Sequence, residues 1–297
     1  MLQLDAEAPG RASTTAQPLR RGCPACGRLT EHTRLYSIKN CTILRCAACG
    51  LGRTEALAFD PERYYTDDYF TGHHADGYAD YRGAEPVLRR EFARTVEFIR
   101  MRRDGGRLLE VGCAYGFFLR EAKPFFDVAG IELAADAAAQ ARGSGLNVTT
   151  GAADEATLQR LGDFDVIVML DVIEHLPDPL DLLRLLGRHL VPGGIIVITT
   201  GDFASLAARL SGRHWRLMTP PQHLWFFTPD SMSRMARSAG LDRESIDHPW
   251  KIVPLSLVLF QLRRMLGLPQ GTQASAGGIG LPLNLFDAMR VVLRKPA

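Results

Sequence analysis

The sequence lacks a long apolar run, a surplus of one charge and an N-terminal signal segment. A transmembrane helix needs about 20 mostly apolar residues, and the longest apolar stretch, 252–260, is interrupted by Pro254 and Ser256. Lys and Arg total 35 against 33 Asp and Glu, a net charge of +2, which argues against a protein that grips long nucleic acid by its phosphates. Residues 1–15 lack the apolar core of a signal peptide. We therefore expect a cytoplasmic protein with reduced thiols.

Cysteine is scarce, with six residues, but four of them form two closely spaced pairs, each followed by a glycine. The pairs consist of Cys23, Cys26, Cys46 and Cys49. In a cytosolic chain this C-x-x-C…C-x-x-C spacing predicts a four-thiolate zinc site, because each tight turn lets both sulfurs reach one ion. Four thiolates complete the coordination sphere, so we expect structural zinc that supplies the folding free energy a segment of roughly 40 residues lacks. A redox C-x-x-C pair is the alternative.

Composition divides the chain into a tail, two small segments and a large domain. Residues 1–18 read as a flexible tail, 19–58 as a small zinc ribbon, and 59–104 as a tyrosine-rich helical connector. Five of the seven tyrosines lie in that connector: Tyr64, Tyr65, Tyr69, Tyr78 and Tyr81. We expect these rings either to pack between the zinc module and the large domain or to cover a cofactor cleft. Tyr78 and Tyr81, three residues apart, would share one helix face.

From Arg107 onward short apolar strands alternate with helices. We expect strands at Arg107–Val111, Asp127–Ile131, Leu146–Thr149, Phe164–Leu170, Gly194–Thr200, Arg243–Asp247 and Met289–Lys295. Such alternation predicts a parallel sheet with helices on both faces, and right-handed crossovers place a binding crevice at the carboxyl ends of the strands. The expected fold of residues 105–297 is thus α/β, a doubly wound, mostly parallel seven-stranded sheet of the Rossmann-like kind. Residues 249–286 form an insertion before its last strand.

The turn after the first of these strands indicates what the crevice binds. Starting at Glu110 it reads EVGCAYG, whereas a dinucleotide fingerprint would need glycine where Ala114 and Phe117 stand. An acid at this place would repel a pyrophosphate and attract a cationic ligand. Glu132 ends the second strand, 20 residues after Gly112, at the distance of a carboxylate that accepts both ribose hydroxyls.

These motifs together resemble those of the class I S-adenosylmethionine-dependent methyltransferases, and the resemblance covers nearly the whole chain. The segments that carry it are E-V-G-x-A-x-G (110–116), G-I-E (130–132), F-D-V-I (164–167), D-V-I-E-H-L-P-D-P (171–179) and L-V-P-G-G (190–194). More narrowly, the chain is similar to the branch that contains the ubiquinone-biosynthesis O-methyltransferases and methyltransferases from polysaccharide and secondary-metabolite gene clusters.

The resemblance implies S-adenosylmethionine as the cofactor and suggests its contacts. It implies Glu110 near the methionine amino group, Glu132 on the ribose and Asp171 beside the cofactor. The cofactor-binding turn would consist of Gly112, Cys113, Ala114 and Gly116, with Tyr78 among the covering rings. The family often has an acid on the adenine after the third strand; here either Asp154 has taken that contact or backbone groups replace it.

Four residues are candidates for the methyl-transfer step itself. The reaction is an in-line displacement, so the enzyme aligns the acceptor, excludes water and removes a proton. Asp171, Glu174 and His175 follow the fourth strand, and His223 lies in a Pro-Pro-Gln-His segment after the fifth. We expect His175 or His223 to act as the general base; in a variant, all four residues hold a second divalent ion. The structural alternative is that Glu174 and His175 brace the helix that starts near Asp178.

The expected acceptor is a hydroxyl group of a small molecule, a sugar or a glycolipid, including polyprenyl-linked sugars. The apolar first half of the 249–286 insertion ends in Arg263 and Arg264. It predicts ordinary core packing, a cap over a lipophilic acceptor, or peripheral contact with an anionic membrane. Three competing functions are methylation of a sugar carbon, methylation of rRNA or tRNA bound by the zinc ribbon, and a non-catalytic scaffold. The sequence leaves the oligomeric state open.

Overall fold

The computed structural model describes residues 19–55, 81–255, 258 and 280–297. The predicted tail, residues 59–80 of the tyrosine-rich connector including Tyr78, and the centre of the insertion with Arg263 and Arg264 lie outside these residues. No helix of the described part is long and apolar enough to cross a membrane.

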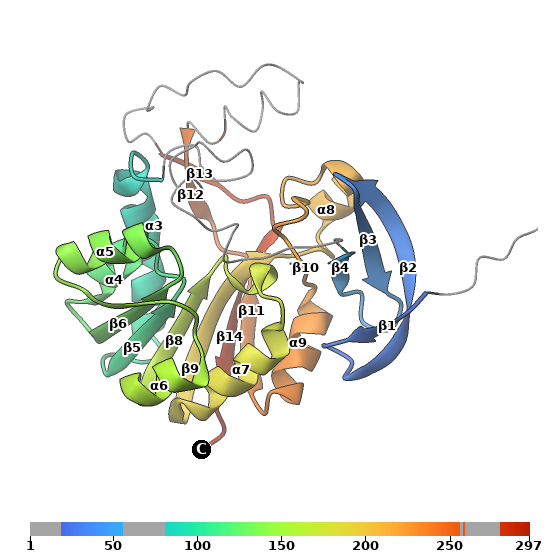
Figure 1. Ribbon diagram of the computed structural model, residues 1–297. Helices are drawn as coiled ribbons and strands as arrows, with labels where there is room; N and C mark the ends of the chain where they lie inside the picture. Colours follow the sequence, from blue (N-terminus) through green and yellow to red (C-terminus); the bar gives the residue numbers. More distant parts are fainter. Residues whose placement is uncertain (1–18, 56–80, 256–257, 259–279) are drawn as a thin grey trace, which may run out of the picture.

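A mixed seven-stranded sheet forms the centre of the protein (Figure 1), in the order β11-β14-β9-β8-β5-β6-β7. Five strands are mutually parallel: β5 (Arg107–Val111), β6 (Asp127–Glu132), β7 (Asn147–Thr150), β8 (Phe164–Leu170) and β9 (Leu190–Gly201). β14 (Ala288–Arg294) runs antiparallel to β9, and β11 (Asp242–Asp247) antiparallel to β14. β11 therefore points the same way as the five parallel strands, and the predicted seven-stranded doubly wound sheet is confirmed.

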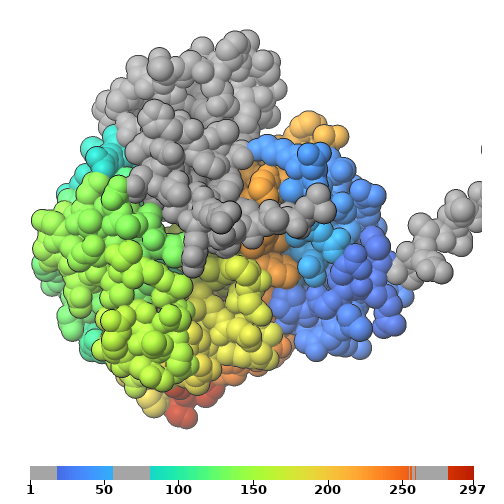
Figure 2. Space-filling view, viewed as in Figure 1, coloured from blue at the N-terminus to red at the C-terminus, as the bar shows by residue number. Residues whose placement is uncertain are grey.

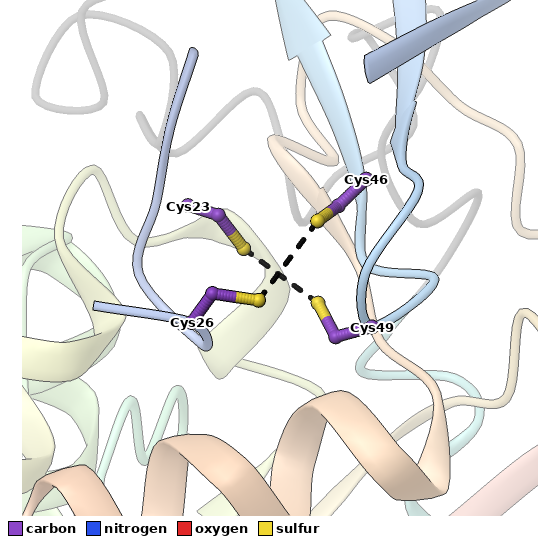
Figure 3. A group of neighbouring side chains, drawn as sticks. All are labelled: Cys23, Cys26, Cys46 and Cys49. Carbon is purple, nitrogen blue, oxygen red and sulfur yellow. Dashed lines mark hydrogen bonds between the residues drawn. The ribbon is translucent and has the colours of Figure 1, made fainter. Parts of the chain in front are cut away.

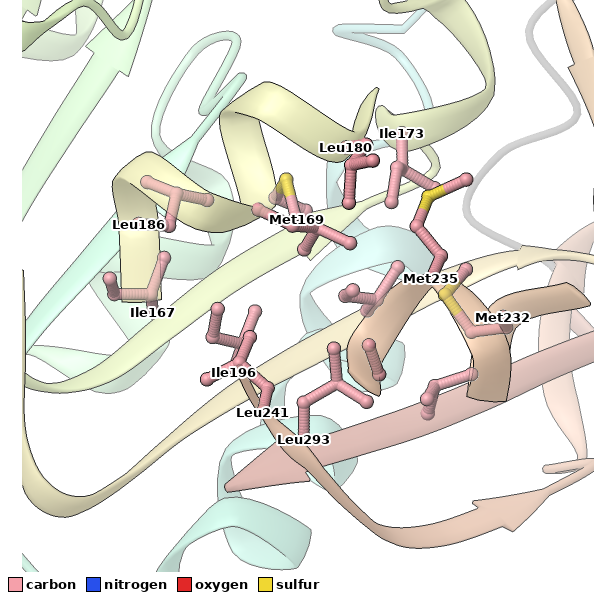
Figure 4. Close-up of a cluster of buried hydrophobic side chains, with 14 of the residues drawn as sticks. Ile167, Met169, Ile173, Leu180, Leu186, Ile196, Met232, Met235, Leu241 and Leu293 are labelled. Carbon is pink, nitrogen blue, oxygen red and sulfur yellow. The ribbon is translucent and has the colours of Figure 1, made fainter. Parts of the chain in front are cut away.

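Helices cover both faces of this sheet and bury one apolar cluster on each. On one face pack α3 (Glu85–Arg100), α4 (Phe117–Ala122) and α5 (Ala135–Gly143). On the other pack α6 (Glu155–Leu161), α7 (Pro179–Arg188) and α9 (Pro229–Ser238). The period-two geometry of a strand divides β8 between them, since Val166 and Val168 face the first cluster and Ile167 and Met169 the second. Figure 4 shows the second cluster, with Met232 and Met235 of α9 facing the sheet.

The helix after β5 is short. α4 begins at Phe117 and ends at Ala122. Gly116 precedes it with φ of 73°, a left-handed conformation that suits glycine and ends the preceding turn. Pro124 lies just beyond the helix and has no N–H to continue the hydrogen-bond ladder.

The paired cysteines belong to a second, five-stranded antiparallel sheet, called here the cysteine sheet. Its strands are β1 (Leu19–Cys23), β2 (Arg28–Ile38), β3 (Cys41–Cys46), β4 (Gly52–Glu55) and β10 (Trp225–Phe226), in that order. The fifth strand thus comes from the large domain. Cys23, Cys46 and Cys49 are buried in the same apolar cluster as α7 and α9, and Figure 2 shows the blue N-terminal residues packed directly against yellow and orange ones. The N-terminal segment is therefore built into the large domain.

The insertion predicted at 249–286 begins and ends with a small two-stranded sheet. β12 (Lys251–Pro254) pairs antiparallel with β13 (Gly280–Leu283). It lies above the central sheet in Figure 1 and contacts α3, where the Ile252 N–H donates to Glu91 at 2.8 Å. Two short elements, α8 (Leu206–Ser211) and a 3-10 turn at Gly212–His214, follow β9.

We expect Gly52→Ala to destabilise the protein by about 1–3 kcal/mol, the usual cost of overpacking. A Cβ at Gly52 would lie 2.8 Å from Cβ of Phe226 and 2.9 Å from Cε1 of Phe203, so it would push β10 away from β4. Urea unfolding measures the effect. Gly22→Ala is the matched control, because a Cβ there meets nothing within 4 Å; equal stability of both variants would contradict the tight β4–β10 contact.

Candidate functional site

The predicted site residues follow the carboxyl ends of neighbouring parallel strands. Glu110 lies in β5, Glu132 ends β6, and Asp171 follows β8. Because parallel strands end at the same edge of a sheet, the chain brings these side chains to one edge from distant parts of the sequence.

Glu132 is buried, with 5% of its surface exposed, and both of its oxygens accept backbone hydrogen bonds. Oε2 accepts from the Ala114 N–H at 2.7 Å and Oε1 from the Ala134 N–H at 2.8 Å. Burial raises the pKa of Glu132, and these two bonds offset part of that rise. Each carboxylate oxygen has a second lone pair, so the group retains the capacity to accept two hydroxyl donors. This capacity is what the predicted ribose contact requires.

Glu110 is buried beside it, with 4% of its surface exposed, and its Oε2 has no hydrogen-bond partner among the described residues. Burial and the negative charge of Glu132 raise the pKa of Glu110 well above its usual range. A buried carboxyl oxygen without a partner is costly. A ligand that brings a cationic group would remove this cost, so the pair fits a ligand with an ammonium group and a ribose.

Close packing explains the glycines of the turn between β5 and α4. Gly112 has φ of 77°, and a Cβ there would lie 2.7 Å from Cγ2 of Val172. Gly116 has φ of 73°, and its Cβ would lie 2.3 Å from Cδ1 of Leu146. The Cys113 sulfur packs against β6, since a Cβ at Gly130 would be only 2.7 Å away. Close contact between the turn and its neighbours thus requires small residues here whether or not a ligand is bound.

Asp154, predicted as an adenine contact, is exposed and caps the N-terminus of α6. Its Oδ1 accepts from the Thr157 N–H at 2.8 Å, and this bond lowers the pKa of Asp154. The cap is a sufficient structural reason for an acid at this position, and the adenine contact stays a prediction. Tyr81, the described member of the tyrosine-rich segment, is buried and stacks on Phe117 with ring centroids 5.5 Å apart.

Asp171 adopts a left-handed backbone with φ of 55° and has partners that the sequence did not suggest. Its Oδ1 accepts from the Thr199 hydroxyl at 2.9 Å, and Nζ of Lys251 lies 3.3 Å from Oδ2. Burial favours the protonated form of Asp171. The ammonium group of Lys251 and the hydroxyl of Thr199 have a larger effect in the opposite direction, so the pKa of Asp171 is lowered. The polar pair Thr199-Thr200 at the end of the apolar β9 is the sequence feature that could have indicated this contact.

Glu174, His175 and His223 form a compact group in which one ligand atom of each lies within 4.8 Å of the others. The two imidazole rings are 4.7 Å apart, edge to face. Of the four residues predicted for a second ion, the structure brings these three together, whereas Asp171 pairs with Thr199 and Lys251. Burial and the charge of Asp171 raise the pKa of Glu174 to about 8, and its Oε2 has no partner within the described residues.

The protonation of the two histidines follows from their surroundings. Burial lowers the pKa of both, and the charge of His175 lowers that of His223 further, well below its usual range. Nδ1 of His175 lies 2.9 Å from the Gln222 carbonyl. A carbonyl only accepts, so Nδ1 of His175 carries the proton. Two imidazoles and a carboxylate grouped this closely suit either a metal site or a proton acceptor.

The cysteine sheet fixes the loop that carries His223. The hydroxyl of Thr54 in β4 donates to the His223 carbonyl at 2.6 Å, and the Thr54 N–H donates to the Leu224 carbonyl at 2.9 Å. The Leu224 N–H in turn donates to the Glu174 carbonyl at 2.8 Å. Sequence reasoning missed Thr54, because nothing in the local sequence marks a contact 169 residues away.

The four paired cysteines converge as predicted (Figure 3). The Sγ atoms of Cys23 and Cys49 are 3.6 Å apart, and those of Cys26 and Cys46 are 3.9 Å apart. Sulfurs about 2.3 Å from a tetrahedral zinc ion lie about 3.8 Å from one another, so the spacing fits one ion. A surface hollow of about 300 Å³ beside Cys26 is lined by Ala25, Arg28, Arg234, Arg237 and Ser238. The arginines would offset the negative charge of four thiolates.

Comparison with known proteins agrees with this architecture. The methyltransferase-domain family matches residues 82–246. A ubiquinone biosynthesis O-methyltransferase of Cereibacter sphaeroides is 32% identical over 154 residues, which cover 47% of this chain and 61% of that protein. One of the same name from Methylococcus capsulatus is 30% identical over 186 residues, which cover 58% of this chain and 78% of that protein. The chain thus spans less than two thirds of the Cereibacter protein.

One solved structure extends the comparison to the fold alone, because the sequence identity is only 11%. It is the magnesium protoporphyrin IX methyltransferase of Synechocystis PCC 6803 with bound SAH, which superposes with a TM-score of 0.50 over 79% of this chain and 98% of that one. The family match covers more than half of this chain and includes Glu110, Glu132, Glu174 and His223, but neither the cysteine pairs nor β12. On this match the chain belongs to the class I S-adenosylmethionine-dependent methyltransferases.

Proposed function

We propose that this protein transfers a methyl group from S-adenosylmethionine to a hydroxyl group of a small-molecule, sugar or glycolipid acceptor. The observation that carries the proposal is the buried pair Glu110 and Glu132, in which one oxygen of Glu110 has no partner among the residues that the structure describes. Two acids in an apolar surrounding destabilise the protein unless a ligand supplies positive charge and hydroxyl donors. The hydroxyl as acceptor is supported by the names of the relatives. Methylation of a sugar carbon or of RNA would use the same donor site.

In this proposal each residue of the donor site has one task. Glu110 would accept from the ammonium group of the methionine portion, and Glu132 would accept from the ribose hydroxyls. The backbone of the turn at 112–116, which begins and ends with a glycine, would lie close to the ligand. When bound, the cofactor supplies an electrophilic methyl group on a sulfonium ion. The chain's own contribution is alignment and the exclusion of water.

We also propose that Glu174, His175 and His223 hold a divalent ion at the acceptor end. Two imidazoles and a carboxylate are ligands that divalent transition metals accept. Their close grouping and Oε2 of Glu174, which has no partner among the described residues, fit this task. Such an ion would lower the pKa of an acceptor hydroxyl. The structure supports a three-residue group here; Asp171 is engaged elsewhere.

A structural zinc ion at Cys23, Cys26, Cys46 and Cys49 completes the proposal. The sulfur spacing and the nearby arginines support it. Because β4 hydrogen-bonds the His223 loop, the zinc ion would stabilise the acceptor end of the site as well as the cysteine sheet.

We expect Glu110→Gln to weaken the binding of S-adenosylmethionine about 10- to 100-fold, the worth of one charged hydrogen bond. Isothermal calorimetry with S-adenosylmethionine and S-adenosylhomocysteine measures it, and thermal unfolding checks that the variant folds. Glu155→Gln is the control, since Glu155 lies exposed on α6. Unchanged affinity in Glu110→Gln would contradict the assignment of the ammonium contact.

We expect Mn²⁺ to bind more tightly as the pH rises towards 8. The ion must displace the proton of Glu174, whose pKa burial raises to about 8, whereas burial lowers the pKa of both histidines; each pH unit below 8 therefore costs about tenfold in affinity. Electron paramagnetic resonance of free Mn²⁺ measures the affinity. Glu174→Gln should weaken binding and remove this pH dependence, and His214→Gln, an exposed control, should leave both intact. Equal binding at pH 6 and 8 would overturn the assignment.

We expect one zinc ion per chain and its loss in Cys46→Ser. Loss of a structural metal is among the changes that cost about 4 kcal/mol or more of stability. Elemental analysis and urea unfolding measure the two effects. Cys41→Ser is the matched control, because Cys41 is also buried but lies outside the cluster; it should retain the zinc ion.

A further inference from the structure

Asp202 and His248 meet at the same edge of the sheet as the residues described above. Asp202 directly follows β9, and His248 directly follows β11. Both strands point the same way, because β14 between them is antiparallel to each. In register, Asp247 pairs with Arg290, which pairs with Thr199. His248 therefore lies one residue beyond the level of Thr199, the residue that holds Asp171.

The pair has the geometry of an imidazole oriented by a buried acid. Asp202 is 4% exposed; its Oδ1 accepts from the Ala204 N–H at 2.8 Å and its Oδ2 lies 2.9 Å from Nε2 of His248. The His248 side chain is 28% exposed, and its carbonyl accepts from Nδ2 of Asn284 at 2.9 Å. An ionised carboxylate only accepts, so Nε2 carries the proton and the lone pair is on Nδ1.

The charged groups around this pair are already matched with opposite charges. Lys251, three residues after His248, pairs with Asp171, and Arg216 pairs with Asp287 through two bonds of 2.8 Å. The Asp202 N–H donates to the Asp287 carbonyl at 2.9 Å. Within the described residues, the Asp202 carboxylate contacts the Ala204 N–H and the His248 ring.

Large apolar side chains flank His248 and remain exposed. Trp250 is 55% exposed, Leu285 54% and Phe286 60%, and the Phe286 ring centroid lies 6.5 Å from that of His248. Exposed aromatic groups beside a polar functional group are typical of a surface that receives a ligand with an apolar body.

We propose that His248, oriented by Asp202, is the general base that deprotonates the acceptor hydroxyl, and that this hydroxyl belongs to an acceptor with an aromatic or otherwise apolar body. The inference rests on the proposed function. The hydroxyl proton passes to Nδ1 of His248, and the oxygen forms a bond to the methyl carbon. The carbon–sulfur bond breaks and its electron pair stays on sulfur, which gives S-adenosylhomocysteine and an imidazolium ion paired with Asp202. Glu174, His175 and His223 are then left to hold the divalent ion.

The orientation of the imidazole can be tested without an acceptor. Long-range ¹H–¹⁵N NMR of the full chain at pH 8, with His248→Gln to assign the signal, reports which nitrogen carries the proton. We expect the Nε2–H form in the wild type. In Asp202→Asn the new amide can donate to Nε2, so the Nδ1–H form should replace it. An Nδ1–H form in the wild type would overturn the proposal.

The catalytic role is tested with 4-nitrocatechol as an aromatic hydroxyl probe and methyl-labelled S-adenosylmethionine. We expect the wild type to methylate the probe. The rate of transfer should fall at least about 100-fold in His248→Gln and in Asp202→Asn. It should equal the wild-type rate in the control His214→Gln. Affinity for S-adenosylmethionine should not change in any of them. Retained transfer in His248→Gln, or no transfer to the probe by the wild type, would refute the inference while the donor site stands. Failure of the wild type to bind S-adenosylmethionine would instead refute the proposed function.

Discussion

The burial of acidic side chains where parallel strands end is the constraint on which the site depends. Glu110, Glu132 and Glu174 are each at most 5% exposed, and a carboxyl group in such a place costs free energy unless it is protonated or paired. The two apolar clusters on the faces of the sheet supply the stability that tolerates this cost. In the proposed function these acids are in place before a ligand binds, which is the preorganisation that methyl transfer needs.

A second dependence links the cysteine sheet to the chemistry. Two hydrogen bonds from Thr54 fix the backbone of the His223 loop, and the Thr228 hydroxyl donates to the Cys49 carbonyl at 3.2 Å. The cysteine sheet therefore contacts the loop that carries His223, a residue of the proposed acceptor end. This contact gives a physical reason for an N-terminal segment that the family match at 82–246 leaves out.

The sequence predicted the fold well because its signals are local. A continuous apolar run such as Phe164–Leu170 predicts a buried strand from a few neighbouring residues. The two cysteine pairs predict a metal site in the same way. The contacts that shape the site are not local: Lys251 reaches Asp171 from 80 residues away, and Asp202 meets His248 across 46. Both depend on the register of β11, β14 and β9 and on the path of the insertion, which no spacing in the sequence encodes. For that reason the sequence grouped Asp171 with Glu174 and the histidines and gave no indication that Lys251 pairs with it.

The separation along the chain of the two halves of the site has an evolutionary consequence. The proposed donor contacts fall within one contiguous stretch, 110–171. The proposed acceptor end adds β4, the His223 loop, His248 and the residues before β14 to Glu174 and His175. Exchange of the N-terminal 55 residues or of the insertion between related genes would therefore leave the donor half whole and reshape the other. Such an arrangement lets a lineage acquire new acceptors by recombination while its use of the methyl donor is inherited unchanged.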